Sequence, residues 1–200
     1  MNFTDLQAQR HSVYALGRNV SQTPTALFDL IKLAVKQAPT AFNNQSVRVV
    51  LLTGAAHEKL WAITAQRLQQ EVPDAAAYEK TLAKINQAFQ AGFGTVLFYT
   101  DTAVVTEFEE TVPLYADNFY DWSEQGHGIA EYATWLALTE LGLGASLQHY
   151  NPLIDAPVAE AFAIPATWRL RAQMPFGSIE TPGVAKESVD DSARFKWIKA

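Results

Sequence analysis

The stretch from residue 123 to 152 contains a helical segment with almost no charge, and this segment limits the folds open to the chain. Between Glu124 and Glu140 the only charged residue is Glu131. Large apolar residues occur at positions that fall on every side of a helix: Ile129, Tyr132, Trp135, Leu136, Leu138 and Leu141. A helix without a polar face cannot lie exposed to water, so we expect this one in a core or in a subunit interface.

A short strand and a polar turn follow this helix. Gly142 and Gly144 are typical helix-ending residues, and residues 145–147 have the composition of a buried strand. Polar and aromatic side chains then follow in a row: Gln148, His149, Tyr150 and Asn151. The end of a buried strand is a common place for a ligand site in α/β proteins, so this turn is a candidate site.

Two other segments have the composition of buried strands. Residues 47–53 are rich in β-branched residues and leucine, which favours a strand. Residues 95–101 are a nearly unbroken apolar run, which indicates burial on both faces.

Residues 168–177 alternate between two kinds of side chain, a pattern typical of a strand with one exposed face. The side chains expected on one face are Trp168, Leu170 and Ala172. Those expected on the other face are Arg169, Arg171 and Gln173.

Helices are predicted over most of the remaining chain. Thr4 and Gln7 resemble a capping box that opens a short helix ending near Arg10. Apolar periodicity and helix breakers predict further helices at 24–38, 57–71, 74–91, 102–122 with a break at Pro113, and 155–164. Because helices arrive in consecutive pairs and do not alternate strictly with strands, we expect an α+β layered fold and a single domain over residues 1–200.

Composition excludes several classes of partner and site. With 48% hydrophobic and 18% charged residues, 200 residues can bury a substantial core. The net charge of -6 argues against a nucleic-acid or anionic-membrane surface as the main partner. The chain has no cysteine, which removes disulfides, thiolate metal sites and cysteine nucleophiles. No apolar run is long enough to span a bilayer or act as a signal core, so we expect a cytoplasmic protein.

Familiar catalytic motifs are also absent from the sequence. The segments GHGIAE at Gly126 and GLGASL at Gly142 each lack the third glycine of a dinucleotide loop, and neither follows a strand. There is no phosphate-loop motif and no Gly-x-Ser-x-Gly elbow, and the four histidines lack metal-site spacing. If the protein is an enzyme, an organic cofactor is expected to carry the chemistry.

Four features, in order along the chain, resemble the nitroreductase family of FMN flavoproteins. They are Arg10-His11-Ser12 after a short N-terminal helix, PTAFNNQ at 39–45, GLGAS at 142–146, and a basic C-terminal patch. Within the family the chain is similar to the shorter branch of fatty-acid-repression-type, nitroreductase-like proteins. The stretches that carry this similarity are AGFGTVLFYTD, WSEQGHGIAEYA, GLGASLQHYNP and AQMPFG.

The resemblance implies a fold, an assembly and a reaction. The fold is nitroreductase-like, with a central mixed, mostly antiparallel sheet flanked by helices. The assembly is an intertwined homodimer with two FMN sites at the subunit interface, each lined by both chains. The reaction is ping-pong transfer of two electrons from NAD(P)H, through flavin N5, to a small-molecule acceptor such as a nitroaromatic or a quinone. Hydride transfer of this kind requires no general acid or base, so no catalytic side chain is expected.

The resemblance also implies cofactor-binding residues. Those matching phosphate and ribityl contacts are Arg10, His11, Ser12, Arg194 and Lys196. Those on the loop that approaches the flavin and ribityl chain are Asn43 and Gln45, and those on the flavin N5 side are Gln148 and His149. Lys84 matches a basic residue near flavin N1 and O2. FMN carries a dianionic phosphate, which an acidic protein has to bind with clustered cations.

Two other functions fit the same residues. A flavin-binding redox sensor or regulatory protein would use the same site with little turnover. A cofactor-free structural or partner-binding dimer would use the aromatic-rich segment 102–122 only as an interface. Each candidate residue, taken singly, also fits an ordinary role on the surface, in a turn or in the core.

Overall fold

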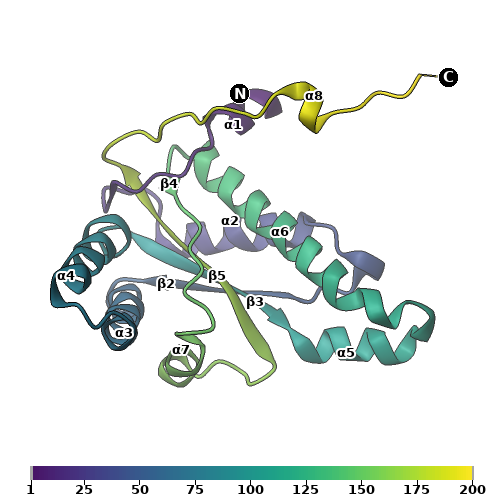
Figure 1. Ribbon diagram of the computed structural model, residues 1–200, viewed down its shortest axis with the longest axis horizontal. Helices are drawn as coiled ribbons and strands as arrows, with labels where there is room; N and C mark the ends of the chain where they lie inside the picture. The colour runs from purple at the N-terminus through teal and green to yellow at the C-terminus, as the bar shows by residue number, and fades with distance from the viewer. Residues whose placement is uncertain (1, 200) are drawn as a thin grey trace.

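The computed structural model describes residues 2–199 and places a five-stranded sheet between two layers of helices (Figure 1). The strands are β1 (Leu16–Gly17), β2 (Val47–Thr53), β3 (Gly94–Asp101), β4 (Gly144–Ala145) and β5 (Trp168–Ile179). Their order is β1-β5-β3-β2, with β4 paired to β5, and each of these pairs is antiparallel. The α+β class and the largely antiparallel sheet predicted above are therefore confirmed.

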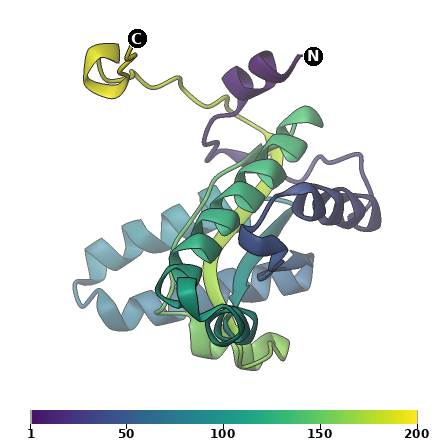
Figure 2. The ribbon, with the colours of Figure 1, turned by 90° about the vertical axis from the view of Figure 1, so that its right-hand side faces the viewer.

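Helices cover both faces of the sheet. The α-helices are α1 (Phe3–Gln9), α2 (Pro24–Gln37), α3 (Ala55–Glu71), α4 (Ala75–Lys84), α5 (Thr102–Thr111), α6 (Ala116–Glu140), α7 (Asp155–Phe162) and α8 (Asp191–Arg194). Short turns of other helix types are η1 (Ala41–Asn43), η2 (Ile85–Gln90) and η3 (Pro113–Tyr115). Figures 1 and 2 show α3, α4 and α7 on one side of the sheet and α2 and α6 on the other.

Strand β3 is buried along its whole length, which confirms the prediction of burial on both faces. Its side chains alternate between two separate core clusters. Leu97 and Tyr99 pack in one cluster with Trp61 of α3, whereas Val96 and Phe98 pack in a second cluster that also contains residues of α2 and α6. Burial of apolar side chains in both clusters is what holds the two helical layers to the sheet.

The prediction for β5 is wrong about its faces, because the strand contains a β-bulge at Arg171. Leu170 pairs with Tyr99 and Ala172 pairs with Phe98, so Arg171 is an extra residue with no partner of its own on β3. Leu170 and Ala172, which were expected on the same face, therefore pack in opposite clusters. Gln173 was expected to be exposed but is fully buried, because Gln148 pairs with it from the other side.

Two smaller expectations also differ from the structure, and one short strand was not expected. The first helix is capped by Asn2, whose side-chain oxygen accepts a hydrogen bond from the Asp5 amide at 3.0 Å, so Thr4 is not its cap. The strand expected at residues 145–147 is only the two-residue β4. Strand β1 was not predicted, since two residues are too few to show a period.

Helix α6 is only half covered by its own chain. Ala130, Thr134 and Leu138 are buried, but Ile129 and Tyr132 on another side of the helix are 44% and 37% exposed. One side of α6 therefore lies in the core, as expected for this helix, and its other side presents an apolar surface to solvent. None of the helices formed by residues 2–199 is long and apolar enough to cross a membrane.

We expect Gly177→Ala to lower stability by about 1–3 kcal/mol, the usual cost of overpacking. A Cβ atom on Gly177 would lie 2.1 Å from the Gly17 carbonyl oxygen on the neighbouring strand β1. The matched control is Gly128→Ala in α6, where a Cβ would meet no atom within 4 Å. Alanine there should leave stability unchanged or raise it, because glycine is a poor helix former. Urea unfolding monitored by circular dichroism measures both, and equal effects would contradict this account of the β1–β5 contact.

Candidate functional site

The N-terminal segment after α1 crosses the edge of the sheet in an extended form. Ser12 forms a parallel bridge with Ala145, and the Val13 amide donates to the Ala145 carbonyl oxygen at 2.9 Å. Val13 is buried, whereas Tyr14 is exposed. This pairing fixes the backbone and directs the polar side chains of the segment away from the core.

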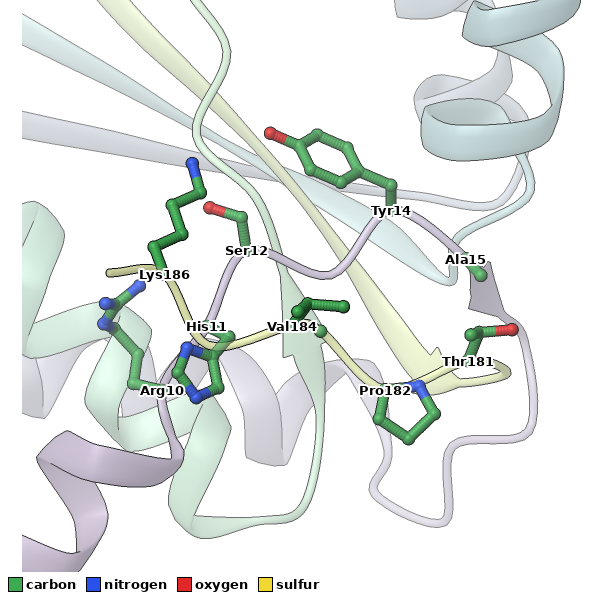
Figure 3. Close-up of a pocket in the computed structure, with 10 residues that line it drawn as sticks. Arg10, His11, Ser12, Tyr14, Ala15, Thr181, Pro182, Val184 and Lys186 are labelled. Atoms are coloured by element: carbon green, nitrogen blue, oxygen red, sulfur yellow. The ribbon is translucent and has the colours of Figure 1, made fainter. Parts of the chain in front are cut away.

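A groove of about 690 Å³ lies between this segment and the chain that follows β5 (Figure 3). Its lining residues come from both ends of the sequence: Arg10, His11, Ser12, Tyr14, Ala15, Thr181, Pro182, Gly183, Val184 and Lys186. The two segments approach closely at Gly183, where a Cβ would lie 2.8 Å from the His11 Cβ and 2.9 Å from the Ser12 carbonyl oxygen. Glycine is therefore needed at this position for the groove to keep its shape.

The groove has the charge and donors of an anion-binding site. It brings together the Arg10 guanidinium, the Lys186 ammonium and the Ser12 hydroxyl. In Figure 3, Arg10 and Ser12 lie on the N-terminal segment and Lys186 lies on the facing segment after β5. The Arg10 guanidinium carbon lies 4.6 Å from the ring centroid of Trp135 on α6, a cation–π contact that holds its position. Among the described residues, no Asp or Glu lines this groove.

Lys186 was missed by the sequence analysis. It is a single lysine in the segment TPGVAKES, which has no motif and no periodicity. The available signal is Pro182-Gly183, a turn pair directly after a strand, which reverses the chain toward the N-terminal segment.

Asn43 and Gln45 lie in a different place, on the loop between α2 and β2. They line a pocket of about 230 Å³ together with Lys36 and Arg48. Three loop residues that are not glycine have left-handed backbones: Phe42 at φ 52°, Asn43 at φ 53° and Gln45 at φ 49°. This conformation costs roughly 1–2 kcal/mol for Phe42 and for Gln45 and less for Asn43, whose short polar side chain tolerates it. Strained residues of this kind cluster at ligand sites.

An apolar groove of about 380 Å³ runs between the same loop and α6. It is lined by Pro39, Thr40, Ala41, Phe42, Trp122, Gln125, Gly126 and Ile129. The rings of Phe42 and Trp122 are nearly parallel, at 18°, with centroids 6.0 Å apart. Tyr115 and Phe119 complete this aromatic cluster, so part of the aromatic-rich segment is core and part faces solvent.

Gln148 and His149 lie in the turn that follows residues 145–147, as the sequence predicts. The Gln148 amide and carbonyl both pair with Gln173 of β5, at 2.8 and 2.9 Å, and its side-chain Nε2 donates to the Ser146 hydroxyl at 3.0 Å. His149 is exposed.

Gln173 is a second residue that the sequence analysis did not single out as part of a site. Its side-chain oxygen accepts a hydrogen bond from the Tyr150 amide at 2.8 Å, which fixes the turn after Gln148.

The remaining three candidates, Lys84, Arg194 and Lys196, line neither the groove at Arg10 nor the pocket at Asn43. Lys84 is exposed at the end of α4, with its ammonium 5.7 Å from the ring centroid of Phe89. Arg194 and Lys196 are exposed, and Figures 1 and 2 both show their segment standing away from the sheet. One chain therefore brings Arg10, His11 and Ser12 together. It holds the other candidates in separate places: Asn43 and Gln45 on the loop, Gln148 and His149 in the turn, Lys84 on α4, and Arg194 and Lys196 near the C-terminal end. Residues 2–199 contain no cluster of His, Asp and Glu suited to a metal ion.

Comparisons with known proteins agree on one family. The sequence model of the nitroreductase family matches residues 8–178. The HBN1 protein of Saccharomyces cerevisiae is 32% identical over 175 residues, which are 86% of this chain and 86% of HBN1.

Solved structures give the same result. The chain superposes on nitroreductase CinD from Lactococcus lactis, solved with nicotinic acid, with a TM-score of 0.90 and 50% identity over 99% of this chain and 100% of CinD. CinD has also been solved with chloramphenicol and with 4-nitrophenol. A nitroreductase with bound FMN from Desulfitobacterium hafniense shares the fold, with a TM-score of 0.72 and 19% identity over 100% of both chains.

Proposed function

Because the chain belongs to the nitroreductase family, we propose that it is an FMN-dependent NAD(P)H oxidoreductase that reduces nitroaromatic or quinone-type acceptors by ping-pong two-electron transfer. Family membership confirms the resemblance carried by residues 10–12, 39–45 and 142–146. The observation that carries the proposal is the groove in which Arg10, Ser12 and Lys186 meet.

The donors in this groove fit the phosphate and ribityl chain of FMN. A phosphate dianion needs several charge-assisted donors in a protein of net charge -6, and the groove supplies an arginine, a lysine and a hydroxyl. Its volume of about 690 Å³ lies within the usual range of cofactor pockets. In this proposal Arg10 and Lys186 bind the phosphate, and His11 and Ser12 contact the phosphate or the ribityl oxygens.

The other candidate residues would hold the ring system. Bound FMN would supply the redox chemistry, by accepting a hydride from NAD(P)H and giving it to the acceptor. Asn43 and Gln45 present amide groups on the strained loop, and Gln148 presents a side chain whose backbone is fixed by β5. Amide donors of this kind orient a flavin and stabilise negative charge on it. Lys84, His149, Arg194 and Lys196 stay predictions from the family resemblance.

The apolar groove beside the loop suits a flat organic acceptor. Phe42 and Trp122 offer aromatic faces there, and aromatic rings stack on such faces. The 50% identical CinD has been solved with nicotinic acid and, at 49% identity, with 4-nitrophenol, which are both small aromatic rings. A nitroaromatic or quinone-type acceptor is the class that this surface favours.

We further propose that the active form is a homodimer with a site shared between the two chains. Within one chain the phosphate groove and the strained loop lie at different places on α6, next to Trp135 and next to Gly126 respectively. The exposed stripe of Ile129 and Tyr132 lies between them on the same helix and offers an apolar contact surface. Residues 1–200 acting as one domain, a cytoplasmic location and the absence of a nucleic-acid partner remain predictions from the sequence.

The function is tested by adding FMN to the purified protein and then NADH or NADPH with a nitroaromatic. We expect a bound-flavin absorption spectrum, a thermal midpoint that rises with FMN concentration, and steady-state turnover. Reduction of one flavin equivalent without turnover would instead support a redox sensor. A protein that neither binds FMN nor gains stability from it would contradict both flavin functions and favour a cofactor-free dimer.

Arg10→Ala and Lys186→Ala should each raise the FMN dissociation constant by about 10–100-fold, because a hydrogen bond to a charged group contributes roughly 1.5–3 kcal/mol. Titration of flavin fluorescence measures the change. Lys80→Ala, which removes an exposed lysine on α4, is the control and should bind FMN as the unmodified protein does. Equal affinities in all four proteins would exclude this groove as the phosphate site.

Ile129→Lys should shift the protein from dimer to monomer in sedimentation experiments, because it places a charge within the proposed apolar contact on α6. The control is Leu33→Lys on α2, a residue that is also exposed but lies away from α6's stripe. A dimer that both variants preserve would place the subunit interface elsewhere.

A further inference from the structure

The loop from residue 40 to 46 needs an external support. Phe42, Asn43 and Gln45 all have left-handed backbones without being glycine. Such a conformation persists only where the surrounding structure holds it. Part of the support is internal, since the Gln45 amide donates to the Thr40 hydroxyl at 3.0 Å. This bond closes the loop on itself and does not fix the loop relative to the rest of the fold.

Asn44 connects the loop to the fold. It is 6% exposed, whereas Asn43 and Gln45 on either side of it are exposed and line the polar pocket. The Asn44 side-chain oxygen accepts a hydrogen bond from the Ser46 amide at 3.1 Å, and its Nδ2 donates to the Ser123 hydroxyl at 3.2 Å. The side chain thus links the loop both to the start of β2 and to α6.

Both partners of Asn44 are themselves fixed. Ser123 is 1% exposed within α6. The Ser46 carbonyl oxygen accepts a hydrogen bond at 2.8 Å from the amide of Asp101, at the end of β3. Three residues after Ser123, Gly126 leaves room for the loop, since a Cβ there would lie 3.2 Å from the Thr40 methyl group. Ser123 and Gly126 thus form a flat, small-residue seat on α6 for the loop.

We propose that Asn44 is the positioning residue of the cofactor loop: its buried amide, clamped between Ser46 and Ser123, holds Asn43 and Gln45 in the left-handed conformations that present them to FMN. This inference rests on the proposed function. Removing the amide leaves the Ser46 N–H and the Ser123 hydroxyl buried without a partner, so the loop moves to bring them to water. Asn44 acts through its neighbours and does not itself touch the cofactor.

Asn44→Ala should raise the FMN dissociation constant on the order of tenfold, the factor expected for losing one or two polar contacts. The control is Thr64→Val, which removes another fully buried hydrogen bond, from Thr64 to the Leu60 carbonyl oxygen on α3. Asn44→Ala should lower the thermal midpoint of the FMN-free protein and weaken FMN binding, whereas Thr64→Val should leave FMN affinity unchanged. An affinity within twofold of the unmodified protein would overturn the proposal.

A double-mutant cycle separates positioning from a general loss of structure. Gln45→Ala should raise the FMN dissociation constant severalfold in the unmodified protein and by less than about twofold in the Asn44→Ala background, because the contact is already lost there. Factors that simply multiply would overturn the proposal.

Ser123→Ala keeps the test available if Asn44→Ala does not fold. It leaves the loop sequence intact, removes one of the two bonds, and should weaken FMN binding in the same direction; unchanged binding would count against the clamp. If the unmodified protein does not bind FMN, the proposed function and this inference both fail. If it binds FMN and the variants bind equally well, only this inference fails.

Discussion

Strand β3 has apolar side chains on both faces and no exposed residue, so water has to be excluded from the sheet on both sides. Helices α3 and α7 cover Leu97 and Tyr99, and α2 and α6 cover Val96 and Phe98. The long helix α6 therefore lies across the sheet with one side buried. Two features of the proposed site rest on this helix, since Arg10 packs on Trp135 and Asn44 bonds to Ser123. The need to bury the centre of the sheet thus also places the polar groups that surround the proposed cofactor.

The elements of the fold could be predicted from local sequence where a period or a breaker was present. Strand β2 has the predicted bounds, and α2 begins at Pro24 as expected. The bulge at Arg171 could not be predicted, because an alternating pattern looks the same whether or not one residue is left unpaired. The burial of Gln173 could not be predicted either. It depends on Gln148, which is distant in sequence and pairs with it only in the folded sheet.

The candidate site could be predicted only in pieces. Arg10, His11 and Ser12 form a contiguous motif, and the structure places all three in one groove. Lys186 belongs to no motif, and the Pro182-Gly183 turn before it does not show that the chain reversal after β5 brings this lysine to the N-terminal segment. Asn44 was one of two neighbouring asparagines in a turn-like segment. Only the backbone geometry distinguishes it, by burying its amide between Ser46 and Ser123 while Asn43 stays exposed.

The position of β5 affects the order in which the protein can be made. This strand comes late in the sequence but lies between β1 and β3 in the sheet. During synthesis, β3 therefore leaves the ribosome with one edge unpaired, and it stays so until β5 has emerged. An apolar strand with a free edge is prone to pair with other chains. Since Lys186 follows β5, the groove forms only after this strand has been made, and a premature stop before β5 would remove both the closed sheet and the groove.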